Sequence, residues 1–259
     1  MKKVVVDYSN KYQLELHGGD RKNFLHGMCT SQIKEMKAGD WLYTSCLNAK
    51  GRVLATFDVL AFEESIVLVA DKHVGEKVYE LFDSHIIADD VELSKRQGAL
   101  FKIWSDIPSV WSAKLTEGEC HEEFSDEEAI ECRRIEAGFP KYDQDVSESY
   151  FPFESGLEQY IDYKKGCYLG QEPVARVKYK GEPKKVLCGF TFSDNDFPAL
   201  GATIAHSEKP NAGVLTSKVV SPNFGPIGLG YVYKSVFTSG AEVSIEGKKA
   251  MMRLSLIHI

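Results

Sequence analysis

The chain has 259 residues, of which 43% are hydrophobic and 27% charged, and its formal net charge at pH 7 is −7. These values are typical of a soluble globular protein with one large or two ordinary domains. The negative charge argues against a general nucleic-acid binder. The longest apolar runs, such as residues 66–70, are far too short to span a membrane. Because the N-terminus turns polar too soon for a signal peptide, we expect a cytoplasmic protein with no membrane partner.

The cysteines indicate neither a disulfide framework nor a zinc site. No two of them form a C-x-x-C pair, and the adjacent Cys120 and His121 lack a second pair at ligand spacing. We therefore expect no metal site from a local motif. The six cysteines are Cys29, Cys46, Cys120, Cys132, Cys167 and Cys188.

The first part of the chain predicts mixed strands and helices. Helices are expected from Asp20 to Gly27 and over residues 72–85, where apolar side chains recur at helical spacing. Thr30 and Ser31 can cap another helical turn. We expect strands at residues 3–8, 12–17, 41–47, 52–62, 66–70, 91–93 and 99–104.

The second part predicts one more clear helix and then a β domain. Ser125 and Glu128 form a capping-box pattern that opens a helix ending at Gly138, and a short helix is possible near residues 155–163. A linker at residues 180–183 divides a first region, 1–180, from a second, 181–259. Six short strands predict a small antiparallel barrel, at residues 186–193, 201–206, 212–220, 227–233, 241–246 and 249–256.

Residues 164–172, with the sequence KKGCYLGQE, place one cysteine between a lysine pair and a Gln-Glu pair. Gly166 and Gly170 favour a tight, exposed loop. Lys164 and Lys165 would stabilise the thiolate of Cys167, which is the reactive form of the side chain. An incidental cysteine in a basic loop is the alternative. Residues 164–185 carry seven basic and two acidic side chains, and they form either an anion-attracting surface or a solvated hairpin.

Several blocks of the chain match one pattern in the same order. They are NFLHGMCTS at residues 23–31, LNAKGRVLA at 47–55, RIEAGFP at 134–140, PFESGL at 152–157, KGCYLGQE at 165–172 and GVLTS at 213–217. With these blocks the chain resembles the YgfZ/GcvT-like folate-binding proteins, relatives of the glycine-cleavage aminomethyltransferase. The KGCYxGQE motif is specific to the YgfZ branch.

The resemblance implies an α+β fold: a GcvT-like ring of α+β subdomains closed by a C-terminal antiparallel β-barrel, with tetrahydrofolate in the central opening. In the aminomethyltransferase branch, a pair of aspartates follows the Asn-x-x-Gly turn. Those positions are Ala55 and Thr56 here, and neither side chain can steer a proton as a carboxylate does. Asp58 lies two residues further on.

The resemblance also implies roles for particular residues. Glu154 matches the glutamate that meets the pterin edge, where a carboxylate can accept two parallel hydrogen bonds. Arg176 is the favoured partner for the folate tail because of its bidentate fork, with Lys164, Lys165 and Lys178 as alternatives. Tyr168 and Phe153 stack on the pterin or pack in the core. Arg134 and Glu136 form a structural ion pair or contact the ligand. The expected folate-binding set is Glu154, Lys165, Gly166, Tyr168, Gly170, Gln171, Glu172 and Arg176, and Cys167 is the expected reactive residue.

Three functions remain open at this point. The first is a tetrahydrofolate-binding accessory protein that supports iron–sulfur cluster assembly or repair in client enzymes, including tRNA-modifying ones, through Cys167. One cysteine cannot hold a cluster alone, so a client or assembly protein, or a second subunit, would share the site. The second is a folate-dependent one-carbon transferase or demethylase, which the missing carboxylate pair disfavours. The third is direct tRNA binding, which only the basic residues 164–185 support.

Overall fold

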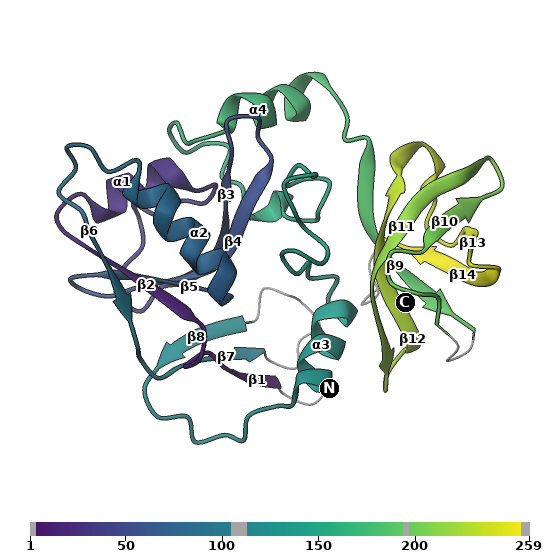
Figure 1. The fold of residues 1–259 in the computed structure, drawn as a ribbon, viewed down its shortest axis with the longest axis horizontal. Coiled ribbons are helices and arrows are strands. Elements are labelled where there is room, and N and C mark those ends of the chain that lie inside the picture. The colour runs from purple at the N-terminus through teal and green to yellow at the C-terminus, as the bar shows by residue number, and fades with distance from the viewer. Residues whose placement is uncertain (1–3, 105–112, 194–196, 255–259) are drawn as a thin grey trace.

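The computed structural model describes residues 4–104, 113–193 and 197–254 (Figure 1). One predicted strand begins at residue 3 and another ends at residues 255–256, so those ends lie outside the described residues. Within the described part of the chain, no helix is both long and apolar enough to cross a bilayer.

A five-stranded antiparallel sheet forms the body of the first region, with the strand order β3-β4-β5-β2-β6. Helices α1 (Arg21–Met28) and α2 (Lys72–Asp83) pack against it. Phe82 of α2 meets Phe24 and Phe57 edge-on, with ring centroids 5.5 and 6.4 Å away, as the helical spacing over residues 72–85 predicts. The strands are β2 (Tyr12–His17), β3 (Trp41–Leu47), β4 (Val53–Ala61), β5 (Ile66–Ala70) and β6 (Glu92–Arg96).

A second, three-stranded sheet has the order β1-β7-β8, formed by β1 (Val4–Asp7), β7 (Leu100–Trp104) and β8 (Ala113–Glu117). β1 and β2 are consecutive in the chain yet belong to different sheets. The buried Gln13 joins the two sheets, because its Nε2 donates to the carbonyl oxygens of Tyr8 (3.3 Å) and Gly98 (2.8 Å). Helix α3 (Glu127–Glu136) contacts β1 and lies between this sheet and the C-terminal region (Figure 1).

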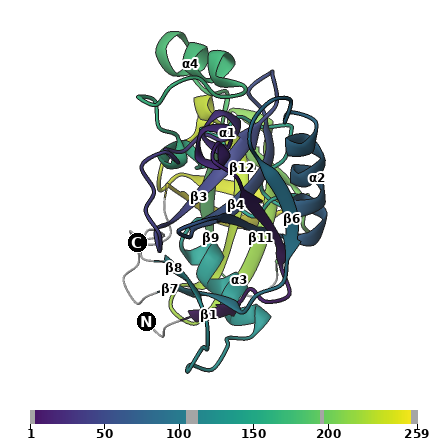
Figure 2. The same cartoon turned by 90° about the vertical axis from the view of Figure 1, so that its left-hand side faces the viewer.

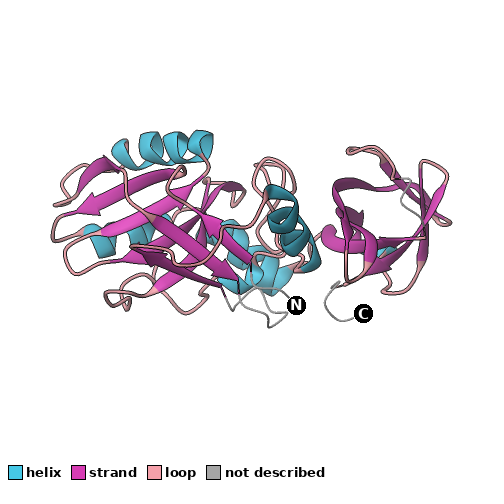
Figure 3. Cartoon of the chain, turned by 90° about the horizontal axis from the view of Figure 1, so that it is seen from below, coloured by secondary structure: helices cyan, strands magenta, loops and turns pink. Residues whose placement is uncertain are grey.

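The C-terminal region is a closed antiparallel barrel with the order β10-β11-β12-β9-β14-β13. Seen from below, it forms a lobe of its own beside the first region (Figure 3). The predicted α+β fold with a C-terminal barrel is therefore confirmed. The strands are β9 (Lys185–Phe192), β10 (Thr203–His206), β11 (Lys209–Ser221), β12 (Gly225–Tyr233), β13 (Glu242–Ile245) and β14 (Lys248–Arg253), with a short 3-10 helix, η3 (Lys234–Val236), between β12 and β13.

Buried polar contacts fasten the barrel to α3. The guanidinium of Arg134 donates to Asp145 Oδ2 (2.6 Å) and to Ser217 Oγ of the barrel (2.7 Å). The hydroxyl of Tyr231 on β12 donates to the Asp145 carbonyl oxygen at 2.7 Å. Glu136 accepts hydrogen bonds from Ser221 and Asn223 of the barrel side. Of the two alternatives for Arg134 and Glu136, the ion pair between them is wrong, since each binds other partners.

Four local predictions differ from the structure. The side chain that caps α3 belongs to Asp126, which accepts from Ala129 N at 2.7 Å, while the Ser125 hydroxyl accepts from Val5 N. Thr30 starts no helix, because its hydroxyl bonds to side chains of β3 and to the Tyr160 carbonyl oxygen. The helix expected near residues 155–163 shrinks to the 3-10 turn η2 (Glu158–Tyr160).

The fourth difference is helix α4 (Gln171–Lys180), which lies at one end of the molecule (Figure 2) and stands where a solvated hairpin was one alternative, while the predicted loop is present up to Gly170. It begins at Gly170, whose φ is +79°. A β-carbon there would lie 2.4 Å from the Asn48 carbonyl oxygen, so this glycine is required. Gly166 has neither a positive φ nor a neighbour within 4 Å of such a β-carbon, and its predicted conformational role is wrong.

Candidate functional site

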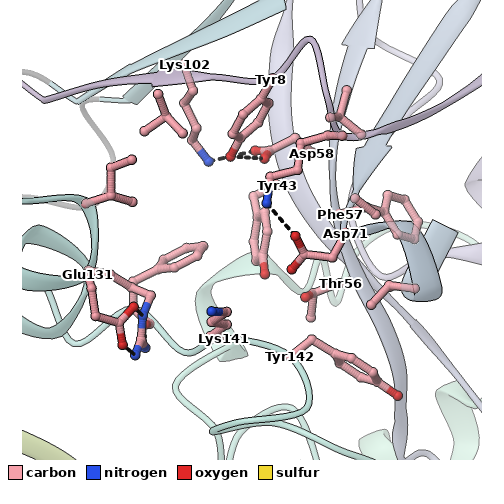
Figure 4. A pocket seen from close by; sticks show the side chains of 18 of the residues that line it. Tyr8, Tyr43, Thr56, Phe57, Asp58, Asp71, Lys102, Glu131, Lys141 and Tyr142 are labelled. Carbon is pink, nitrogen blue, oxygen red and sulfur yellow. Dashed lines mark hydrogen bonds and ion pairs between the residues drawn. The ribbon is translucent and has the colours of Figure 1, made fainter. Parts of the chain in front are cut away.

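A cavity of about 560 Å³ lies where the two sheets meet α3 and the segment that follows it (Figure 4). Its walls come from β1, β3, β4, β5, β7, the start of α2, α3 and residues 139–144. A cavity of this size is in the range that holds a small organic ligand. No single stretch of the sequence makes it, because it exists only once both sheets and α3 are assembled.

Aromatic rings form much of the cavity wall. Tyr43 projects from β3 beside Phe139, with their ring centroids 4.8 Å apart, and Trp104 lies 6.2 Å from Phe139. Burial raises the pKa of Tyr43 far above its ordinary value, so its phenol stays neutral. These rings offer flat apolar surfaces to a planar ligand.

A buried ion pair closes one end of the cavity. Lys102 Nζ donates to Asp58 Oδ1 at 2.8 Å, and both side chains are almost fully buried. Trp41 Nε1 donates to the same oxygen at 2.9 Å. The Tyr8 hydroxyl donates to Oδ2 at 3.0 Å (Figure 4). Burial and then the Asp58 charge raise the pKa of Tyr8, which keeps this phenol a donor.

The Lys102 ammonium is enclosed by aromatic rings as well as by Asp58. Its Nζ lies within 6 Å of five ring centroids, the nearest at 4.9 Å. A cation surrounded in this way needs its counter-ion, because water cannot solvate it. The rings belong to Tyr8, Trp41, Tyr43, Trp104 and Phe139.

Further charged groups surround the rest of the cavity. Asp71, at the start of α2, pairs with Lys11 (Figure 4). Glu131 pairs with Arg134; burial raises the pKa of Glu131, but the hydrogen bonds from Arg134 outweigh it, so the net pKa is lowered and the group stays ionised. Lys141 is exposed, and its ammonium forms no hydrogen bond or ion pair among the residues that the structure describes. The cavity thus presents groups of both signs.

Strand β4 carries Ala55 and Thr56, the positions at which we expect the aminomethyltransferase branch to have its pair of aspartates. Successive residues of a strand face opposite sides, so Thr56 and Asp58 point to the cavity while Ala55 points into the core, where it is 1% exposed. An acid at residue 56 would face the ligand. Asp58 faces the same side one repeat further along, but its two oxygens are already bound by three donors. It is an anchor for Lys102, and it is not a free base.

The segment from residue 162 to 169, which we call the strap, lies against the end of α1. Its Lys165 is 5% exposed, and Nζ donates to the carbonyl oxygens of His26 (2.5 Å), Cys29 (2.6 Å) and Ser31 (2.7 Å). Burial lowers the pKa of Lys165. A lysine that satisfies the last carbonyls of a helix stabilises that end. The ammonium predicted to stabilise the Cys167 thiolate is therefore occupied elsewhere.

The remaining strap residues differ in their exposure. Tyr168 is 7% exposed and packs in the core, as one of the two predicted roles requires. Its neighbour Cys167 is exposed, as is Gly166. The backbone N–H of Leu169 donates to the Gly27 carbonyl oxygen at 2.9 Å. The strap thus presents the Cys167 sulfur to solvent between two residues, Lys165 and Tyr168, that are anchored in the protein.

At the start of α4 lie Gln171, half-buried, and Glu172, exposed in the first turn, where a negative charge suits the helix dipole. Arg176 is exposed on α4. Neither the strap residues 165–169 nor α4 lines the cavity. The structure therefore brings the predicted residues together in two places, and both are separate from the cavity wall.

Glu154 lies in a third place. Its carboxylate accepts from Phe151 N (3.0 Å) and pairs with Arg52 (3.4 Å), and its backbone carbonyl accepts from Leu187 N of the barrel. Arg52 also stacks over the Phe151 ring at 3.8 Å. Glu154 does not line the cavity, and its pterin contact stays a prediction.

Sequence reasoning missed the cavity residues themselves. Lys102 has no motif around it, and Tyr43 and Trp104 sit in ordinary strand patterns. The one available signal was a lysine inside an apolar strand, LFKIW, which requires a buried counter-ion. Among the described residues, no three His, Cys, Asp or Glu side chains cluster as a metal site.

Comparisons with known proteins agree with this geometry. Residues 2–104 match the GCVT N-terminal domain. Over 99% of its length the chain superposes on aminomethyltransferase T of the glycine cleavage system from Bartonella henselae, covering 86% of that chain with a TM-score of 0.83 and 18% identity. The chain thus has a GcvT-like fold.

The relatives found by sequence include proteins named YgfZ. The chain is 25% identical to the tRNA-modifying protein YgfZ of Yersinia enterocolitica, over 72% of this chain and 70% of the relative. It is 26% identical to an uncharacterized protein of Haemophilus influenzae (81% and 82% covered) and to a putative chloroplastic transferase of Arabidopsis thaliana (93% and 68%). These similarities support a place for this chain in the YgfZ/GcvT-like family.

Proposed function

We propose that this protein binds a tetrahydrofolate in the central cavity and acts as an accessory factor for iron–sulfur enzymes, with Cys167 as its reactive thiol. The observation that carries the proposal is the separation of two sites on one fold. One is an aromatic-walled cavity, and the other is an exposed cysteine on a strap that the buried Lys165 fastens to α1.

The residues of the cavity fit a folate. Tyr43, Phe139 and Trp104 would hold the planar pterin between apolar surfaces. Lys141 would meet a carboxylate of the glutamate tail, since its ammonium is exposed at the cavity and forms no ion pair among the described residues. Bound tetrahydrofolate would supply one-carbon or reducing chemistry. This chain would orient the ligand and exclude water from its ring.

Cys167 would act outside the cavity. Its exposure leaves the sulfur accessible to a large partner, and thiolate sulfur is a natural ligand of iron–sulfur clusters. A client or assembly protein would supply the remaining ligands. The name of the YgfZ relatives, tRNA-modifying protein, fits an indirect role, in which the client enzymes modify tRNA.

A one-carbon transferase is the alternative, and the side chains of Thr56 and Asp58 on β4 disfavour it. Thr56 offers a hydroxyl where the transferases carry a carboxylate, and Asp58 already accepts three hydrogen bonds, one of them from its counter-ion Lys102. Turnover of a methylated amine together with tetrahydrofolate would favour this alternative over the accessory role.

Complementation tests the role of the thiol. In a strain that lacks its own YgfZ-type protein, we expect Cys167→Ser to fail to restore the activity of iron–sulfur tRNA-modifying enzymes, while Cys120→Ser, a partly exposed control, restores it. Both variants should fold, since neither removes a core side chain. Full restoration by Cys167→Ser would refute the reactive-thiol proposal.

A further inference from the structure

A pair of buried cysteines lies under the strap, and neither the cavity nor Cys167 uses it. Cys29, which follows α1, forms an isolated antiparallel bridge with Cys46 on β3. Both residues are 0% exposed and both are thiols. The sequence separates them by 17 positions, so only the fold brings them together.

The backbone hydrogen bonds show which kind of bridge this is. Thr30 N donates to the Ser45 carbonyl oxygen at 3.0 Å. This bond joins the residue after Cys29 to the residue before Cys46, which is the pattern that flanks a non-hydrogen-bonded antiparallel pair. In such a pair the two Cα atoms lie roughly 4.5 Å apart and the side chains project to the same side. Disulfides span Cα separations of about 4.4–6.8 Å.

We propose that Cys29 and Cys46 are a second redox site of this protein, a dithiol that forms an intramolecular disulfide by exchange with a low-molecular-weight disulfide. One thiolate attacks a sulfur of the small disulfide, which gives a mixed disulfide and releases one small thiol. The other protein thiolate then attacks the protein sulfur of the mixed disulfide, forms the Cys29–Cys46 bond and releases the second small thiol. Two protein thiols are oxidised and one small disulfide is reduced.

The strap controls access to the pair. It covers residues 26–31 through the three bonds of the Lys165 ammonium, through Leu169 N to the Gly27 carbonyl oxygen (2.9 Å) and through Asp162 N to the Thr30 carbonyl oxygen (3.0 Å). In the closed fold, burial raises the pKa of both thiols and keeps them unreactive. Local opening of the strap exposes them.

The oxidised pair would in turn hold the end of α1 against β3. That end carries the carbonyl oxygens that Lys165 binds, so the disulfide fixes the support of the strap. The redox state of the buried pair is thereby linked to the segment that presents Cys167. This inference does not depend on folate binding or on the role of Cys167.

A thiol map in glutathione buffers tests the proposal, using Cys167→Ser so that the exposed thiol cannot exchange. After acid quenching, unfolding and alkylation, peptides are identified by mass spectrometry. As the share of oxidised glutathione rises, we expect the alkylated fractions of Cys29 and Cys46 to fall together and the two residues to appear in one linked peptide, two hydrogens lighter than the sum of the two reduced peptides. The buried cysteines Cys132 and Cys188 serve as controls and should stay alkylated.

A second variant makes the assignment specific. Cys46→Ala should abolish the linked peptide, and Cys29 should then carry glutathione or remain reduced. The proposal is wrong if Cys29 and Cys46 stay fully alkylated at every ratio, or if either is linked to Cys120 instead. If Cys46→Ala does not fold, the map of Cys167→Ser alone decides the question.

Discussion

The central cavity and the strap are built in different ways. The cavity draws its wall from two sheets and α3, using residues as distant as Tyr8, Lys102 and Tyr142. The strap is one continuous segment whose sequence is recognisable at sight. The KGCYLGQE motif therefore identifies the strap but gives no information on the cavity, although both are needed for the proposed function.

Their buried charges differ too. In the cavity, Lys102 is neutralised by Asp58 and surrounded by rings. In the strap, Lys165 donates hydrogen bonds only to carbonyl oxygens and lies 5.1 Å from the Tyr168 ring centroid, and no carboxylate among the described residues forms an ion pair with it. An ion pair can be replaced as a unit, whereas an ammonium on carbonyl groups depends on the backbone around it. Substitutions at these two lysines test this difference.

The largest effect should follow from breaking the pair in the cavity. Asp58→Ala leaves the Lys102 charge buried without its counter-ion, and we expect the free energy of unfolding to fall by about 3–5 kcal/mol. Urea unfolding measures this loss. The double variant Asp58→Ala with Lys102→Met should recover much of it, because no charge is then left unpaired.

The partly exposed pair between Asp71 and Lys11 is the matched control. Asp71→Ala should cost about 1 kcal/mol or less, as exposed ion pairs do. An equal loss in both aspartate variants would contradict the view that Asp58 acts as a buried counter-ion.

In the strap, Lys165→Met should lower the free energy of unfolding by about 3 kcal/mol. A hydrogen bond to a charged group contributes about 1.5–3 kcal/mol, and the loss of three is partly offset because Met removes the cost of burying a charge. Limited proteolysis should then cut within residues 162–169. The adjacent Lys164 is exposed, and Lys164→Met should change stability by no more than about 0.5 kcal/mol. Similar values for the two variants would show that the Lys165 contacts do not hold the strap.

A smaller effect should come from pH. Burial, helped by the Lys165 charge, lowers the pKa of His26 to about 4 from its ordinary 6.5, and its neutral Nδ1 accepts from Ile33 N. Between these values the unfolded chain binds more protons than the folded one. The contribution of neutral His26 to the free energy of unfolding is therefore fully present above pH 6.5. It is lost as the pH falls toward 4, by about 1.4 kcal/mol per pH unit at the steepest. Urea midpoints should show this slope, and His26→Gln should flatten it.

Much of the fold could be predicted from local patterns. The barrel strands, the hairpin of β3 and β4 and the helix over Phe82 all follow from side-chain periodicity. Helix α4 could not, because its sequence QEPVARVKYK buries only Val174 and lacks an apolar stripe. The pairing of β1 with β7 rather than β2 also depends on long-range contacts.

For the site, the sequence identified the exposed Cys167 and the glycine at residue 170 correctly in structural terms. It could not tell that Lys165 turns inward, because a lysine beside a cysteine has the same letters whether it faces the thiol or a helix end. Nor could it find Lys102, whose partner Asp58 is 44 positions away.

A substitution at Glu154 distinguishes the folate site that the family resemblance implies from a folate site in the cavity. The family-based role predicts that Glu154→Ala weakens tetrahydrofolate binding by about 1–3 kcal/mol. Its contacts with Phe151 N and Arg52 predict instead a loss of stability at unchanged affinity, and we expect this second result. Calorimetric titration of folded Glu154→Ala measures the affinity, and urea unfolding measures the stability.

Calorimetric titration with tetrahydrofolate tests the central claim most directly, on the natural chain, Cys167→Ala and Lys141→Glu. We expect the natural chain and Cys167→Ala to bind equally and Lys141→Glu to bind at least several-fold more weakly, because the cavity and the thiol are separate sites. Absence of binding to the natural chain, or loss of binding in Cys167→Ala with Lys141→Glu unaffected, would contradict a folate site in the central cavity.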